Sequence, residues 1–129
     1  MPDKIYELYG VRIMECDAEG KPLRSDRDAV DLMGEAWPHR VNLLAVPVSR
    51  LDEDFFRLKT RIAGEIIQKF LTYGFRLAIV GDISRYVDES DALRGFVVEC
   101  NRGAHTWFAK NLEELEARLK TAGNSAGTG

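Results

Sequence analysis

Two short apolar runs, separated by an amphipathic stretch, constrain the fold of this chain more than any other feature. The runs at 41–48 and 76–80 are too continuously apolar for strands that keep one face in water, so both faces of each strand must be covered. Between them, apolar residues recur at helical spacing and stop before Gly74, a typical C-cap; this stripe is Ile62, Ala63, Ile66, Ile67, Phe70 and Tyr73. A strand, a helix and a second strand in this order predict a βαβ unit of a parallel sheet.

Capping residues and alternating apolar residues define the remaining elements. They predict, in chain order, a hairpin of strands 5–9 and 11–16 about Gly10, a helix capped by Ser25 and ended by Pro38, a loop at 83–90, a helix capped by Ser90, a strand at 106–109 and a helix capped by Asn111 with Glu114. The fold class is therefore α/β, with a single mixed, mainly parallel sheet of about five strands and flanking helices, in the order β-β-α-β-α-β-α-β-α. Right-handed crossovers make the last three strands parallel and leave the hairpin as an antiparallel edge.

Length and composition indicate one domain. A chain of 129 residues, 45% of them hydrophobic, can bury a single core. We assign this domain to residues 1–121 and predict a disordered tail at 122–129, whose small polar residues have nothing to bury. The net charge of −3 argues against nucleic acid as a partner. The sequence shows neither a signal peptide nor a membrane-spanning run, so we expect a cytoplasmic protein with no membrane partner.

The cysteines and histidines do not indicate a metal or cofactor site. Cys16 and Cys100 lie in separate predicted elements, which favours reduced and buried thiols. His39 and His105 lack the close pairing typical of zinc ligands. Glycine-rich phosphate loops and the GxSxG nucleophile motif are also missing. We therefore predict no metal, no cofactor and no catalytic residue, and we favour a binding module over an enzyme.

Four segments span most of residues 28–119: DAVDLMGEA, FFRLKTRIAGEIIQKFLTYGFRLAIVGD, LRGFVVECNRG and WFAKNLEELEARL. They resemble an uncharacterised bacterial family of small single-domain proteins. This resemblance implies one domain, but it implies no activity because none is assigned to the family.

The order of the predicted elements is similar to that of the STAS domains, which include the anti-sigma-factor antagonists. In those domains, a turn at the start of the second helix carries a serine that is phosphorylated as a switch. The corresponding place here is 57–61, where Thr60 is the only hydroxyl and where Arg57 and Arg61 replace the aspartate and glycine of the family. The resemblance implies a regulatory module in which Thr60 occupies the place of the phosphorylated serine, while the two arginines depart from the family's motif around it.

Polar residues follow the predicted parallel strands at their carboxyl ends, where α/β proteins bind ligands. The candidate binding residues are Lys59, Thr60, Arg61, Glu65, Asp82 and Arg85, with Ser49, Ser84 and Tyr86 beside them. Thr60, at a helix start between two cations, suits a phosphate or carboxylate. The alternative is that Thr60 only caps the helix and that the two cations are solvated.

Two of these candidates have alternative structural roles. The helical wheel of the second helix, extended backwards, places Lys59 within the apolar stripe. Either the helix begins near Thr60 and Lys59 lies in an irregular connection, or the ammonium group points inward to an acid or an anion. Asp82 is either a functional carboxylate or a turn former, with Lys59 as a possible structural partner.

Four aromatic and two acidic residues also have expected roles. We expect Trp37 and Trp107 to pack in the core, and one of the adjacent Phe55 and Phe56 to be exposed for a partner. A pair of catalytic carboxylates would require Glu65 and Glu99 to face one cleft.

Two functions remain open. The first is a regulatory or protein-interaction module of STAS-like architecture that binds a protein partner with residues 56–65. The second is a protein or enzyme that binds a small anionic ligand with Lys59, Thr60, Arg61 and Asp82, which requires a concave pocket at the strand ends. The exposed edge of the sheet is also compatible with a homodimer.

Overall fold

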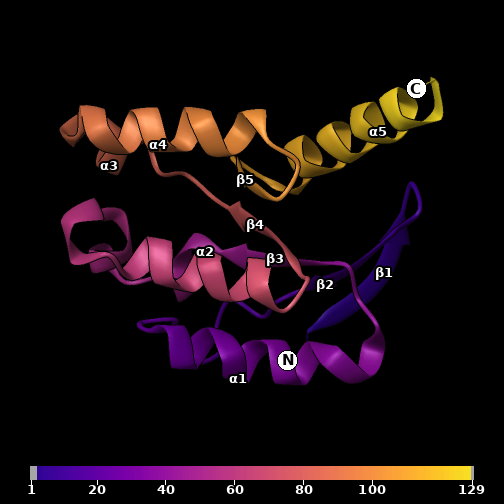
Figure 1. The fold of residues 1–129 in the computed structure, drawn as a ribbon, viewed down its shortest axis with the longest axis horizontal. Helices are drawn as coiled ribbons and strands as arrows, with labels where there is room; N and C mark the ends of the chain where they lie inside the picture. The colour runs from indigo at the N-terminus through magenta and orange to yellow at the C-terminus, as the bar shows by residue number, and fades with distance from the viewer. Residues whose placement is uncertain (1–2, 129) are drawn as a thin grey trace.

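The computed structural model describes residues 3–128, with side chains described as far as residue 122. Its helices and strands (Figure 1) are β1 (Lys4–Leu8), β2 (Val11–Glu15), α1 (Asp26–Ala36), β3 (Leu43–Pro47), α2 (Ile62–Thr72), β4 (Arg76–Val80), α3 (Ser84–Glu89), α4 (Asp91–Arg102), β5 (Thr106–Ala109) and α5 (Leu112–Thr128). The predicted α/β class is confirmed. The backbone of α5 enters the segment 122–129; disorder of that tail and the domain limit at residue 121 stay predictions, and Gly129 lies outside the described residues.

One five-stranded sheet, in the order β1-β2-β3-β4-β5, forms the centre of the molecule. β1 pairs with β2 in antiparallel orientation, and β2, β3, β4 and β5 are parallel to one another. The last three strands are therefore parallel, as predicted, and the second hairpin strand also joins the parallel set. The predicted hairpin turns at Tyr9 and Gly10, which both have positive φ (51° and 81°), as the favoured two-residue turn requires.

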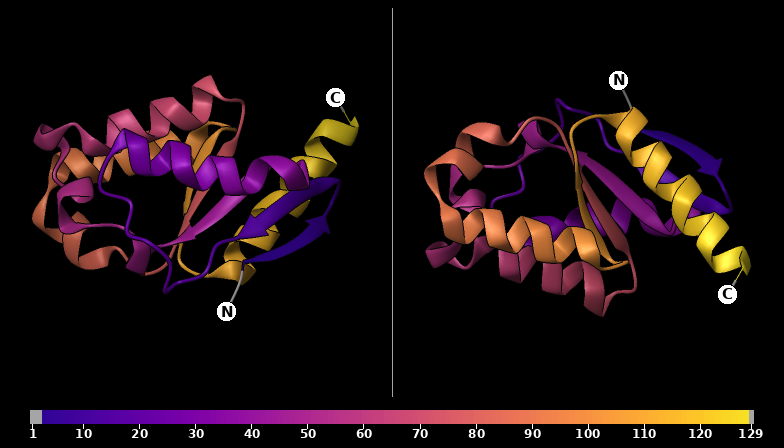
Figure 2. Two further views of the ribbon diagram at one scale, coloured as in Figure 1. Left: turned by 90° about the horizontal axis from the view of Figure 1, so that it is seen from below. Right: turned by 90° about the horizontal axis from the view of Figure 1, so that it is seen from above.

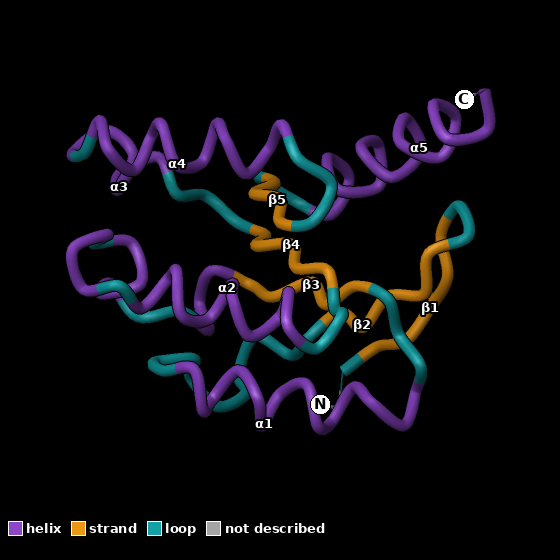
Figure 3. Tube along the Cα trace, in the orientation of Figure 1, coloured by secondary structure: helices purple, strands orange, loops and turns teal. Residues whose placement is uncertain are grey.

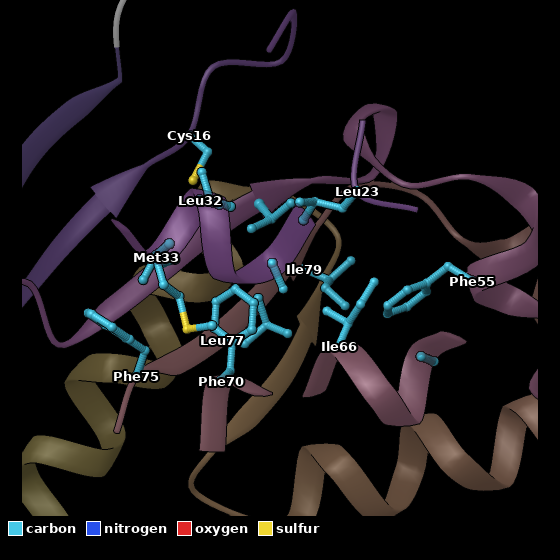
Figure 4. Packing of buried hydrophobic residues seen from close by; sticks show 14 of the residues in the cluster. Cys16, Leu23, Leu32, Met33, Phe55, Ile66, Phe70, Phe75, Leu77 and Ile79 are labelled. Atoms are coloured by element: carbon cyan, nitrogen blue, oxygen red, sulfur yellow. The ribbon is translucent and has the colours of Figure 1, made fainter. Parts of the chain in front are cut away.

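Helices cover both faces of the sheet (Figure 2). α1, α2 and α4 lie on one face, where Leu32 and Met33 of α1 and Ile66 and Phe70 of α2 meet Leu77 of β4 (Figure 4). Of the helices described, only α5 crosses the other face. The buried residues on that face form a second cluster: Ile13, Leu43, Ala45, Ala78, Trp107, Ala109, Leu115 and Leu119. Coverage of both faces explains why the strands at 41–48 and 76–80 are continuously apolar.

The predicted helix caps are confirmed. The hydroxyl of Ser25 accepts the backbone N–H of Asp28, and that of Ser90 accepts the N–H of Leu93. The amide oxygen of Asn111 accepts the N–H of Glu114 at 2.8 Å, so α5 begins where the sequence indicates. Gly74 terminates α2 as predicted: it follows the C-cap residue Tyr73, and its φ of 79° lets the Phe75 N–H donate to the Phe70 carbonyl at 2.9 Å.

The predicted loop at 83–90 is wrong, because its centre forms α3. The Asp82 carboxylate accepts the N–H of Ser84 at 2.9 Å and directs the chain into the helix. Ile83, Tyr86 and Val87 then pack against the core, which stabilises a helix of only six residues. A helix this short shows too little periodicity to be recognised from sequence.

Several predictions of burial are also wrong. Trp107 is a core residue, as expected. Trp37 is instead 63% exposed, because α1 ends at Ala36 and Trp37 begins the 3-10 turn that follows. Phe55 and Phe56 are both buried, since they belong to a separate 3-10 turn (Glu53–Phe56) and do not have to share the α2 stripe. Cys16 is buried as predicted, whereas Cys100 is only half-buried.

A buried arginine holds the connection between β2 and α1. Arg50 is 4% exposed, and its guanidinium donates hydrogen bonds to the backbone carbonyls of Lys21 at 2.8 Å and Asp17 at 2.9 Å. Its own carbonyl accepts the N–H of Leu23 at 2.7 Å. Nothing in the sequence indicates this role, because the residues that meet here are about 30 positions apart.

Candidate functional site

The candidate site lies beyond the carboxyl ends of β3 and β4. The connection 48–61 follows β3, α3 follows β4, and because these strands are parallel the two segments project from the same edge of the sheet (Figure 3). Ligands of α/β proteins commonly bind at this edge. The location predicted from the sequence therefore exists as one region of the fold.

The chain changes conformation sharply at the start of α2. A 3-10 turn (Leu58–Thr60) is followed by Arg61 in the left-handed conformation, with φ 66° and ψ 3°, and α2 begins at Ile62. The predicted break is confirmed: Lys59 belongs to the turn and is exposed, so it does not enter the apolar stripe of α2. Within residues 3–128, the structure shows no ion pair for Lys59 or Arg61.

Thr60 uses its hydroxyl locally. The oxygen lies 2.7 Å from the backbone carbonyls of both Asp54 and Arg57, to either of which the hydroxyl can donate, and it accepts the N–H of Ile62 at 3.3 Å. The side chain is half-buried. The N-cap position of α2 is Arg61, so Thr60 is not the cap residue itself; its hydroxyl bonds the first N–H of the helix and ties the two 3-10 turns together.

A hollow of about 670 Å³, here called the basic hollow, lies between the 53–59 connection and α3. Its lining comprises Glu53, Phe56, Arg57, Leu58, Lys59, Arg85, Tyr86, Glu89, Ser90 and Ala92. Glu53 pairs with Arg57 at 3.6 Å and with Arg85 at 2.9 Å. Since Lys59 has no such acidic partner among the described residues, its ammonium group is the free cation of this lining.

Two stacked aromatic rings form one wall of the basic hollow. Phe56 and Tyr86 lie parallel, with ring centroids 4.2 Å apart and an interplanar angle of 7°. The Tyr86 hydroxyl accepts a hydrogen bond from Arg85 at 2.7 Å, and this bond is the main reason why the pKa of Arg85 is raised above its ordinary value; nearby Glu53 acts in the same direction. The wall thus fixes one guanidinium at the rim of the hollow.

A shallower groove of about 500 Å³ runs along the exposed side of α2 and is called the α2 groove below. Its lining comprises Asp26, Leu58, Arg61, Gly64, Glu65, Gln68, Lys69 and Phe96. Leu58 lines both the α2 groove and the basic hollow, so the two depressions meet at this residue. Together they form one surface, the α2 surface, which contains Lys59, Arg61, Glu65 and Arg85.

Asp82 is separate from this surface. It lines neither depression, and its carboxylate is exposed and hydrogen-bonded to Ser84. Hydrogen bonds from Ser84, first from its hydroxyl and then from its backbone N–H, lower the pKa of Asp82. Between residues 3 and 128 the structure shows no ion pair of Asp82 with Lys59, so Asp82 is a turn former here.

The remaining candidates do not gather into a reactive centre. Glu99 pairs with Arg102 at 3.0 Å and lines neither the basic hollow nor the α2 groove, so it does not face Glu65 across a cleft. In the described part of the chain, no group of three His, Cys, Asp or Glu side chains is placed to hold a metal ion. None of the helices described there combines the length and apolar character needed to cross a bilayer.

Sequence reasoning missed the apolar members of the α2 surface. Leu58 lies in a turn and Phe96 in α4, and nothing in their sequence positions indicates that they line one groove. The stack of Phe56 on Tyr86 likewise joins residues thirty positions apart. The adjacent Phe55 and Phe56 did indicate a functional surface, but they predicted one exposed ring, whereas both rings are buried and Phe56 forms a wall of the basic hollow.

Comparison with known proteins identifies the family of the chain. No curated protein and no solved structure is significantly similar to it. Residues 8–119 match the family model described as "Domain of unknown function (DUF4180)", a range that contains β2 to β5 and the α2 surface. The chain therefore belongs to the DUF4180 family.

Proposed function

We propose that this domain is a regulatory or protein-interaction module that binds a protein partner through the α2 surface. The observation that carries the proposal is the meeting of the basic hollow and the α2 groove at Leu58. The basic hollow in this surface lies at the edge of the sheet where α/β proteins bind other molecules.

The chemistry of the α2 groove supports a protein partner. Leu58, Gly64 and Phe96 provide an apolar centre, and Arg61, Glu65 and other polar residues surround it. An apolar centre with a polar rim is the usual anatomy of a protein interface. The predicted resemblance to STAS domains points to the same place, because the phosphorylated turn of those domains lies at the start of the second helix.

The left-handed Arg61 also supports a binding role. A non-glycine residue in this conformation is strained, and such residues concentrate at functional sites. No side-chain hydrogen bond or ion pair of Arg61 is found among residues 3–128, so the strain is not offset by a visible contact. We infer that the guanidinium is kept there for a partner.

Phosphorylation of Thr60 stays a prediction under this proposal. A phosphate on the hydroxyl would break its hydrogen bond to the Asp54 or Arg57 carbonyl, and it would add negative charge between Lys59 and Arg61. Modification would therefore reshape the turn as well as its charge. Mass spectrometry of the protein after incubation with kinases of its host tests this version.

The proposal is tested by charge reversal at the centre of the surface. Immobilised Arg61→Glu protein should fail to retain a partner that the wild type retains from a lysate of the host. Lys120→Glu is the matched control, because it makes the same change in charge on exposed α5, across the sheet. Far-ultraviolet circular dichroism should show both variants folded. If Arg61→Glu retains the same proteins as the wild type, the proposal is wrong.

A second candidate function is favoured by the basic hollow. Its depth, the free ammonium group of Lys59 and the fixed guanidinium of Arg85 suit a small anionic ligand. Binding to the native state must raise the melting temperature. A thermal-shift screen of phosphate, carboxylates and nucleotides should then find at least one stabilising compound, whose effect is lost in Lys59→Ala and kept in Lys120→Ala. A screen without any stabilising compound counts against this candidate and leaves the protein-binding proposal standing.

A further inference from the structure

Trp37 is more exposed than any other large apolar residue described, at 63%. It follows α1 and precedes β3, whereas Tyr73, Gly74 and Phe75 follow α2 and precede β4. Because β3 and β4 are parallel, these two connections lie together where the amino-terminal ends of the two strands meet, at the opposite end of the strands from the basic hollow (Figure 3). A tryptophan here contributes little to the core and requires another explanation.

A groove of about 590 Å³, called the Trp37 groove, lies between the two connections. Its lining comprises Trp37, Pro38, Arg40, Val41, Tyr73, Gly74 and Phe75. The floor is formed by Val41 and Phe75, which are nearly buried, and the exposed rings of Trp37 and Tyr73 form its sides. The Trp37 ring is held edge-on against Phe75, with centroids 5.9 Å apart. A rigid, apolar slot with aromatic sides suits one inserted apolar side chain.

The charge of the groove comes from arginine. Arg40 is the one charged residue of the lining, and it has the left-handed conformation, with φ 55° and ψ 39°. No ion pair of Arg40 is found within residues 3–128. A second guanidinium lies close by, since Arg12 donates a hydrogen bond to the carbonyl of His39 at 2.6 Å. The slot therefore adjoins positive charge that no acidic side chain of its lining neutralises.

We infer that the Trp37 groove binds a segment of another protein that carries an apolar anchor residue beside a carboxylate. The anchor occupies the slot over Phe75, and the carboxylate pairs with Arg40. A second copy of this chain fits less well, because a two-fold contact centred on this patch would bring the two Arg40 side chains close together, and the lining supplies no carboxylate to pair with them. This site is separate from the α2 surface, so the domain is able to connect two partners.

The experiment selects peptides without assuming a partner. A random peptide library displayed on phage is selected on the immobilised full chain, and the recovered peptides are synthesised and titrated by fluorescence anisotropy. We expect recovered sequences with an aromatic or aliphatic residue next to aspartate or glutamate. Trp37→Ser and Arg40→Glu should each weaken their binding by at least about tenfold, and replacement of the peptide carboxylate by its amide should remove the effect of Arg40→Glu.

Controls separate this inference from the proposed function and from misfolding. Arg61→Glu should bind these peptides as tightly as the wild type does, even though it alters the α2 surface. Far-ultraviolet circular dichroism should show that the variants are folded. The inference is overturned if no peptide is recovered, if the peptides lack acidic residues, or if they bind Trp37→Ser unchanged. Self-association of the wild type that Trp37→Ser abolishes would overturn it in favour of a second copy.

Discussion

Replacement of Arg61 by glycine should make the protein more stable while weakening its proposed activity. The left-handed conformation of Arg61 costs a residue with a Cβ roughly 1–2 kcal/mol. Glycine avoids this cost, but its greater conformational entropy stabilises the unfolded chain by about 0.5–1 kcal/mol, which offsets part of the gain. The net effect should raise the free energy of unfolding by about 0.5–1 kcal/mol, which for a chain of this size corresponds to roughly 2–5 °C in melting temperature.

Arg61→Ala is the matched control, because alanine removes the same guanidinium and keeps the backbone strain. Urea unfolding followed by tryptophan fluorescence should rank the stability as Arg61→Gly above both wild type and Arg61→Ala. Both variants should lose the partner retained by the wild type. If Arg61→Gly is no more stable than Arg61→Ala, the strain argument fails; if it is more stable and still retains the partner, Arg61 is not part of the binding surface.

Three further predictions concern buried and capping groups. A methyl group on Gly20 would lie 2.5 Å from the guanidinium carbon of Arg50, so Gly20→Ala should lower the free energy of unfolding by about 1–3 kcal/mol, and by much less when Arg50 is also replaced by alanine. Equal losses in the two backgrounds, measured by urea unfolding in a double-mutant cycle, would refute this coupling. The hydrogen bond from the backbone N–H of Arg24 is the main cause that lowers the pKa of Asp28, so the Asp28 carboxylate stabilises the fold above its unfolded pKa and ceases to do so as the pH falls through its folded pKa. Asp28→Asn should therefore flatten the loss of stability between about pH 5 and pH 2. An acid titration of stability that is the same in the variant and the wild type would contradict this. Burial is the main cause that raises the pKa of Cys16 to about 12, so iodoacetamide at pH 8 should modify this thiol only after unfolding; peptide mass spectrometry that finds rapid modification of the native protein would show that the thiol is accessible.

The sequence was sufficient for the fold where one local signal dominates. The apolar runs of β3 and β4 specify strands covered on both faces, and Ser25, Ser90 and Asn111 each begin a helix with a hydroxyl or amide that accepts a backbone N–H. Helices of more than two turns between these signals were therefore predictable. α3 was missed because its stability comes from packing against the core rather than from its own periodicity.

The candidate site was only partly predictable. Sequence order placed Lys59, Arg61 and Arg85 at the correct edge of the sheet, because the carboxyl ends of parallel strands must meet there. It could not show that Leu58 joins two depressions, nor that Asp82 closes a turn outside them, since both depend on distances between segments. The exposure of Trp37 was missed for a similar reason: the helical spacing of α1 includes it, but the helix ends one residue earlier.

The central claim is that the α2 surface contacts a protein partner, and photo-crosslinking tests it most directly. A photoreactive phenylalanine analogue would replace Glu65, within the α2 groove, or Lys120, which is exposed on α5. After irradiation in cells of the host, we predict that the probe at position 65 forms a discrete covalent adduct with another protein, whereas the probe at position 120 does not. Absence of an adduct from position 65, or the same adducts from both positions, would contradict the claim.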